Sequence, residues 1–261
     1  MKWMDKTGLA MYTLHEAVNK NMEAAFEQAA AIGAHGMEFY GELEAFRPGQ
    51  VINALQSSGL VMTGWHLDWG RLHGKTFYHT VEYLQKCGCT MVVIQCLGGK
   101  WNVGHDQSGE CLDRWIYYAE WMNDVNERLR KEGIRLGYHN HEHEFALHYD
   151  GKTVYDILYG QLERSIIMEL DSGNCIEGGG NPVDVLERYQ DRELILHLKP
   201  YSVQNGFDVI LGEQDDANDW KALLEKGAER SSWLLLESEN TALLEMENVE
   251  KCFQGLKKYL I

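Results

Sequence analysis

Histidine and acidic residues gather at four places in the second half of the sequence, each at or just past the end of an apolar run. The four segments run from Tyr138 to Phe145, from Glu169 to Asp171, from His197 to Lys199 and from Glu237 to Glu239. An ionised group that leaves water without a partner is strongly destabilising, so carboxylates at such positions need a compensating group. A divalent cation bound by Glu, Asp, His and Glu from these segments supplies one. The alternative is a set of ion pairs with Lys199 and Arg135.

Mixed oxygen and imidazole donors favour some metals over others. Such a set suits Mn²⁺, Co²⁺, Fe²⁺ or Zn²⁺ better than Ca²⁺, and Mg²⁺ also stays open. We therefore expect one divalent metal ion as the cofactor, with Mn²⁺ as the first choice.

Short apolar runs alternate with longer amphipathic stretches along the whole chain. The expected strands are 8–13, 36–40, 61–67, 91–96, 135–140, 166–171, 194–199 and 233–238. The expected helices lie near 15–31, 48–58, 76–87, 110–132, 153–161, 182–189, 219–227 and 243–259. Eight consecutive βα units with nearly continuous apolar strands predict an α/β fold, a single (β/α)₈ TIM barrel over residues 1–261. An open doubly wound sheet is the alternative, but no Gly-rich phosphate-binding turn follows the first strand.

The barrel prediction gives the four polar segments a common place. Active sites of such barrels lie at the C-terminal ends of the strands, and these segments follow the last four expected strands. We therefore expect their side chains to meet at one rim of the barrel.

Composition excludes several classes of partner. The net charge of −16, from 40 acidic and 24 basic residues, disfavours nucleic acid and anionic lipid surfaces. No apolar run approaches the roughly 18–20 residues of a membrane span, and the first residues lack a signal-peptide core, so we expect a cytoplasmic protein without a membrane partner. The six cysteines are expected as free, mostly buried thiols. The oligomeric state stays open, a homo-oligomer included.

Several short strings, taken in their order and spacing, resemble one known family. They are Leu9 to Leu14, Tyr138 to His141 with Glu144 and Phe145, Leu170 to Asn174, Gly179 to Pro182, His197 to Lys199, Leu211 to Glu213, Asp219 with Trp220, and Leu236 to Ser238. Together they resemble the sugar phosphate isomerase/epimerase family of xylose-isomerase-like TIM barrels, over nearly the whole chain. The resemblance implies a single divalent metal held by residues from strands five to eight.

Carried over residue by residue, the resemblance places three of these metal ligands on Asp171, His197 and Glu237. The fourth is less direct, because Tyr138 stands where the ketose 3-epimerase branch has a glutamate. We assign Glu144 as the fourth ligand, since its arrangement after the His pair resembles another branch of the family. His141 is the reserve ligand or base.

The remaining site assignments concern catalysis and substrate. We expect Glu237 to serve as ligand and base, Lys199 to neutralise a developing oxyanion, and His141 to be the second acid/base. Alternation along a strand would direct His139, His141 and His143 to one side, with His139 behind the ligands. We expect His143 and His148 to face solvent. Substrate contacts are expected from the following residues: His66, Trp101, Asn174 and Tyr201. Tyr12, Tyr40 and Trp65 are further rings that could stack on a sugar.

These groups suit removal of a proton beside a carbonyl, which gives an enediolate. Its reprotonation makes the chain a metal-dependent isomerase or epimerase of a keto-sugar or related polyol, and we expect a neutral sugar. Loss of a leaving group instead gives a lyase or dehydratase, inosose dehydratase-like or cleaving keto-glycosides. A non-catalytic sugar-binding subunit is a further alternative. A nuclease on this fold is disfavoured by the charge of −16.

Overall fold

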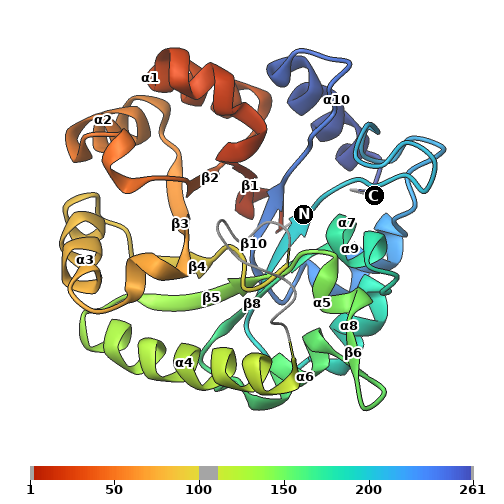
Figure 1. The fold of residues 1–261 in the computed structure, drawn as a ribbon. Helices are drawn as coiled ribbons and strands as arrows, with labels where there is room; N and C mark the ends of the chain where they lie inside the picture. Colours follow the sequence, from red (N-terminus) through yellow and green to blue (C-terminus); the bar gives the residue numbers. More distant parts are fainter. Residues whose placement is uncertain (1–2, 100–110, 260–261) are drawn as a thin grey trace.

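Eight parallel strands close into a barrel in this computed structural model, which describes residues 3–99 and 111–259. The order around the barrel is β1-β10-β9-β8-β5-β4-β3-β2 (Figure 1). The bounds of the strands are β1 Thr7–Ala10, β2 Gly36–Tyr40, β3 Val61–Leu67, β4 Met91–Ile94, β5 Arg135–His139, β8 Ile167–Asp171, β9 Leu194–Leu198 and β10 Ser231–Leu236. The predicted (β/α)₈ TIM barrel is confirmed.

Helices surround the barrel on the outside (Figure 1). Their bounds are α1 His15–Ile32, α2 Pro48–Ser58, α3 Thr76–Lys86, α4 Leu112–Lys131, α6 Val154–Gln161, α8 Pro182–Arg188, α9 Trp220–Gly227 and α10 Glu245–Lys257. Side-chain caps fix several of these starts: Asp219 Oδ1 accepts a hydrogen bond from the Ala222 N–H at 3.0 Å, and Asn181 caps α8 just before Pro182. No helix among residues 3–99 and 111–259 is both long and apolar enough to cross a membrane.

Short elements that the sequence pattern does not predict lie mostly between the strands and the main helices. They are α5 His143–Ala146, α7 Ser172–Glu177, the hairpin β6 His148–Tyr149 with β7 Lys152–Thr153, and four 3₁₀ turns at Met4–Lys6, Met11–Leu14, Leu43–Ala45 and Trp69–Leu72. Five strands end earlier than expected: the first at Ala10 instead of residue 13, the fourth at Ile94 instead of 96, the fifth at His139 instead of 140, the seventh at Leu198 instead of 199 and the eighth at Leu236 instead of 238.

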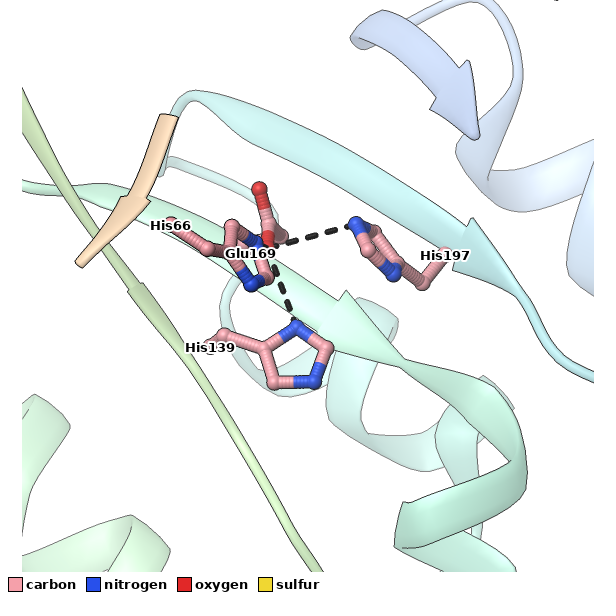
Figure 2. A group of neighbouring side chains, drawn as sticks. All are labelled: His66, His139, Glu169 and His197. Atoms are coloured by element: carbon pink, nitrogen blue, oxygen red, sulfur yellow. Dashed lines mark hydrogen bonds and ion pairs between the residues drawn. The ribbon is translucent and has the colours of Figure 1, made fainter. Parts of the chain in front are cut away.

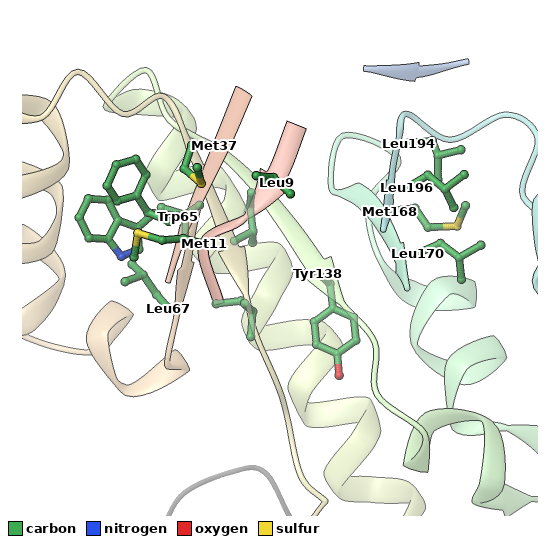
Figure 3. Close-up of a cluster of buried hydrophobic side chains, with 14 of the residues drawn as sticks. Leu9, Met11, Met37, Trp65, Leu67, Tyr138, Met168, Leu170, Leu194 and Leu196 are labelled. Atoms are coloured by element: carbon green, nitrogen blue, oxygen red, sulfur yellow. The ribbon is translucent and has the colours of Figure 1, made fainter. Parts of the chain in front are cut away.

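The core has an outer and an inner part, because side chains alternate along each strand. Outward-facing residues such as Met168, Leu170 and Leu196 pack in the large core between strands and helices (Figure 3). A separate apolar cluster fills the barrel interior and consists of Met91, Val93, Ile167, Ile195 and Leu235.

Polar residues follow the apolar interior cluster on the inward-facing sides of the same strands. Two residues after Ile167 come Glu169 and then Asp171, and two after Ile195 comes His197. The barrel interior is therefore apolar toward the N-terminal ends of the strands and ionisable toward the C-terminal ends.

Candidate active site

Four buried side chains meet at the C-terminal end of the barrel: His139, Asp171, His197 and Glu237. His139 and Asp171 are the last residues of β5 and β8, His197 lies in β9, and Glu237 follows β10. One ligand atom from each lies within 4.8 Å of the others. His197 Nδ1 lies 3.0 Å from Glu237 Oε2 and 4.0 Å from Asp171 Oδ2, and His139 Nε2 lies 3.9 Å from Asp171 Oδ2. These spacings match donors around a single ion.

Asp171 is held so that one carboxylate oxygen remains open. Its Oδ1 accepts a hydrogen bond from the Asn174 N–H at 2.7 Å, which caps α7. Its backbone is clamped by Asn140, whose Oδ1 accepts from the Asp171 N–H at 2.9 Å and whose Nδ2 donates to the Asp171 carbonyl at 3.2 Å. The Oδ2 atom is buried and has no hydrogen-bond partner. Because buried polar atoms are rarely left unsatisfied, this oxygen and its three neighbours fit a divalent cation.

Protonation in the metal-free site follows from burial and neighbouring charge. Burial raises the pKa of Asp171 to about 7, with Glu237 adding to the effect and Lys199 opposing it. Burial, with His197 and His66 nearby, holds the pKa of His139 well below its usual range, so its ring is neutral. Burial opposes protonation of His197, but Glu169 and Glu38 raise its pKa well above the usual value. A cation at this site therefore displaces protons as it binds.

Lys199 is a buried cation beside this group. Its Nζ donates to Glu237 Oε1 at 2.8 Å, forms an ion pair with Glu239 at 2.5 Å and lies 4.4 Å from the centre of the Phe207 ring. Burial alone would lower the pKa of Lys199, but Glu237 and Asp171 raise it above its usual value. The lysine is therefore charged and keeps Glu237 ionised.

A second group of ionisable residues, His66, His139, Glu169 and His197, shares two histidines with the first group (Figure 2). It extends deeper into the barrel, because Glu169 lies two positions before Asp171 in β8. Glu169 Oε1 lies 2.6 Å from His66 Nε2 and 3.0 Å from His139 Nδ1, and Glu38 Oε2 lies 2.8 Å from His197 Nε2. Burial lowers the pKa of His66, but Glu38 and Glu169 raise it to about 10. Sequence reasoning missed Glu38, and it placed Glu169 in one of the polar segments without giving it a role. The sequence signal that could have found both residues is a glutamate at an inward-facing position of an otherwise apolar strand.

Glu144 lies elsewhere than the sequence predicts. It is buried in α5, where its carboxylate accepts hydrogen bonds from the Tyr138 hydroxyl and, at 2.8 Å, from the His141 N–H, and lies 3.1 Å from His143 Nε2. Two groups of side chains among the described residues could hold a metal ion, and neither of them includes Glu144. The structure brings His139 to Asp171, His197 and Glu237 instead.

The histidines after β5 do not continue the expected alternation, because the strand ends at His139 and α5 begins at His143. The prediction that His143 faces solvent is wrong: it is buried, and its Nε2 lies 2.9 Å from the Leu97 carbonyl oxygen. His148 is exposed, as expected. Burial lowers the pKa of His141 to about 4, against the raising effect of Glu144, so this ring is neutral near pH 7.

A cavity of about 430 Å³ opens above the four-residue group. Expected site residues on its wall are His66, His141, Asn174, Lys199 and Glu237, and the expected rings Tyr12 and Tyr40 also line it.

Three other expected sugar-stacking residues have different outcomes. Trp65 packs in the core, while Tyr201 packs against Phe207, with 5.3 Å between ring centres, and is not among the described residues that line the cavity. Trp101 lies outside the described residues. Five of the six cysteines are buried and all are free, Cys111 being the exposed one.

The model of the xylose isomerase-like TIM barrel family matches residues 26–257. The chain belongs to this family. The assignment agrees with the closed barrel and confirms the resemblance seen in the sequence.

Relatives of this xylose isomerase-like TIM barrel differ in reaction. An inosose dehydratase from Geobacillus kaustophilus is 26% identical over 133 residues, which are 48% of this chain and 42% of the relative. The chain thus spans less than half the length of the curated relatives it matches. Among solved structures, a sugar phosphate isomerase/epimerase from Parabacteroides distasonis has a TM-score of 0.76 at 20% identity, covering 98% of this chain and 96% of that one. The IOLI protein with a bound zinc atom has a TM-score of 0.70 at 14% identity, covering 97% and 99%.

Proposed function

We propose that this chain is a divalent-metal-dependent sugar isomerase or epimerase that acts on a keto-sugar or related polyol through an enediolate. The observation that carries the proposal is the buried Asp171 Oδ2, which has no hydrogen-bond partner and faces ring nitrogens of His139 and His197. Zinc in the similar IOLI structure supports a metal here. With Mn²⁺ as first choice, the ion would be held by His139, Asp171, His197 and Glu237, and would act as a Lewis acid toward the substrate carbonyl.

The chain's own residues have separable roles in this proposal. His141 is neutral and lines the cavity, so its imidazole accepts the proton from the carbon beside the carbonyl. Return of that proton to the neighbouring carbon completes an isomerisation, whereas an epimerisation needs a proton delivered to the opposite face of the enediolate. Lys199 is charged and also lines the cavity, so its ammonium stabilises negative charge on the substrate oxygen. The same lysine lowers the pKa of Glu237, which suits that carboxylate better to holding a cation than to taking a proton.

The other residues of the cavity wall indicate what shape of substrate the cavity can hold. Tyr12 and Tyr40 pack edge to face at the cavity, with 5.2 Å between ring centres, and offer apolar surface to the C–H face of a sugar ring. Asn174 is fixed by hydrogen bonds to Asp171 and Asn140, so its position is set before substrate arrives.

The test is a panel of keto-sugars, inososes and glycosides assayed in deuterium oxide with Mn²⁺ and with chelator. We expect one substrate to exchange the proton beside its carbonyl for deuterium only when metal is present. Full activity in chelated, metal-free protein would refute the metal role. Turnover with neither label nor a primary isotope effect at that carbon would refute enolisation.

A metal-dependent lyase or dehydratase is the second candidate. It is favoured by the similarity to inosose dehydratases and by Tyr138 in β5, which stands where the ketose 3-epimerase branch has a glutamate. The same panel separates the two reactions, because a dehydratase yields a product lighter by one water whereas an epimerase yields an isomer of equal mass.

A further inference from the structure

The rings of His139 and His197 each lie between two carboxylates. One ring nitrogen faces Asp171 at the cavity, and the other faces a carboxylate deeper in the barrel. On the cavity side, His139 Nε2 and His197 Nδ1 lie 3.9 and 4.0 Å from Asp171 Oδ2. On the inner side, His139 Nδ1 lies 3.0 Å from Glu169 Oε1, and His197 Nε2 lies 2.8 Å from Glu38 Oε2. Each ring thus stands between an open carboxylate oxygen and a deeper carboxylate.

The contacts on the inner side are short. His66 Nε2 and His139 Nδ1 lie 2.6 and 3.0 Å from Glu169 Oε1, and His197 Nε2 lies 2.8 Å from Glu38 Oε2, close to the roughly 2.7–2.9 Å of charge-assisted N–H···O bonds. His197 Nε2 also lies 3.3 Å from Glu169 Oε1. On the cavity side the ring nitrogens lie 3.9 and 4.0 Å from Asp171 Oδ2, although His197 Nδ1 lies 3.0 Å from Glu237 Oε2. Asp171 Oδ2 therefore has no ring nitrogen within hydrogen-bond distance, whereas each inner carboxylate does.

His66 joins the two inner carboxylates. Its Nε2 lies 2.6 Å from Glu169 Oε1 and 3.0 Å from Glu38 Oε2, and its ring stacks on His197 with 5.6 Å between ring centres. In Figure 2 the Glu169 carboxylate lies among the imidazoles of His66, His139 and His197. Glu38 and Glu169 are 1% and 0% exposed, so no water-facing position is open to either carboxylate.

We propose that Glu169 and Glu38 are positioning residues for the metal-holding histidines His139 and His197, and that His66 ties the two carboxylates together. This proposal rests on the proposed function, because it takes the cavity-side ion as given. A carboxylate that accepts the second ring N–H fixes the tautomer and orientation of a ligand histidine and makes its other nitrogen a better donor. Glu169 is placed to do this for His139 through a contact of 3.0 Å, and Glu38 holds the His197 ring through an ion pair at 2.8 Å.

The rival interpretation is a second metal in the inner group. His66, His139, Glu169 and His197 also present ligand atoms within 4.8 Å of one another. Such an ion would require His139 and His197 to bridge two metals through both nitrogens, and it would displace the contacts of 2.6–3.0 Å between the inner carboxylates and the imidazoles. Metal stoichiometry distinguishes the two arrangements.

The experiment measures metal binding to the purified whole chain, by titration of Mn²⁺ and Zn²⁺ against a chromophoric chelator, with metal content per chain from elemental analysis. The variants are Glu169→Gln and Glu38→Gln. The matched control is Glu144→Gln, an equally buried carboxylate outside both groups of ligand atoms. Thermal unfolding in excess chelator separates loss of fold from loss of affinity.

We expect one ion per chain in the wild type and in each variant. Glu169→Gln and Glu38→Gln should raise the Kd by about 10–100-fold, the usual effect of losing such a partner, while the control stays within about threefold. Co²⁺ bound to Glu169→Gln should show a shifted visible absorption band. In a His139→Ala background the effect of Glu169→Gln should nearly vanish, because its target ring is gone.

Each other result has a definite meaning. Wild-type Kd values in both variants would overturn the positioning role and leave the proposed function standing. Two ions in the wild type and one in Glu169→Gln would replace the proposal by the second-metal arrangement. No ion in the wild type would refute the proposed function itself, and the positioning role with it.

Discussion

Replacing His139 by alanine tests whether His139, at the end of β5, or Glu144, in α5, is the fourth metal ligand of the proposed site. His139 belongs to the group of four that includes Asp171, with its Nε2 3.9 Å from Asp171 Oδ2, whereas Glu144 contacts Tyr138, His141 and His143. Loss of a residue that only supports a ligand typically costs 10–100-fold in affinity, so loss of a ligand should cost at least about 100-fold, or about 2.8 kcal/mol at 1.4 kcal/mol per decade. His139→Ala should therefore bind Mn²⁺ at least about 100-fold more weakly.

Glu144→Gln should give the opposite result. Its Kd should stay within about threefold of the wild type, but its fold should lose about 1–3 kcal/mol, because a buried hydrogen-bonded group is disturbed. Competition titration gives the Kd, and urea unfolding in chelator gives the stability. His148→Ala is the matched control, since His148 is exposed and away from the ligands. If Glu144→Gln loses the metal and His139→Ala retains it, the geometric reasoning is refuted and the original ligand assignment stands.

Further predictions concern chemistry, pH and packing. His141→Ala should lower turnover by about 10²–10⁴-fold at unchanged metal content, and equal turnover would remove His141 from proton transfer. The apparent Kd for metal should rise as pH falls, because protons compete with the ion for the ligands. Below pH 7 the protonation of Asp171, whose pKa is about 7, should raise this Kd about tenfold per pH unit. A Kd that stays constant from pH 8 to 5 would contradict this. Gly178→Ala should destabilise the fold by about 1–3 kcal/mol in urea unfolding, because its Cβ would lie 2.1 Å from the Glu142 carbonyl oxygen. Gly160→Ala in α6 meets nothing within 4 Å and should be neutral or stabilising by up to about 1 kcal/mol, so equal losses in both variants would contradict the packing argument.

The barrel was predictable because its signal is repeated. Apolar runs such as those around Ile167 and Ile195 recur with amphipathic stretches between them, and strand ends must then share a rim. Asp171, His197 and Glu237 follow from this rule, since each sits at or next to the end of its strand. The short helices α5 and α7 have four and six residues, too few for a periodic pattern.

The fourth member of the candidate ligand group was harder to predict for a physical reason. Choosing between His139 and Glu144 requires knowing where the strand stops, because a residue beyond the last strand position no longer follows the inward and outward alternation. The strand stops at His139, and α5 directs Glu144 toward Tyr138 and His143. The contacts of Glu38 and Glu169 could not be predicted, because their partners His197 and His66 come from strands distant in sequence.

Asp171 joins two parts of the cavity in one side chain. One oxygen of this carboxylate caps α7 through the Asn174 N–H, and the other faces ring nitrogens of His139 and His197. Asn174 and Glu177 of α7 form part of the cavity wall. A substitution at Asp171 would therefore disturb the group of candidate ligands and the start of a wall-forming helix together.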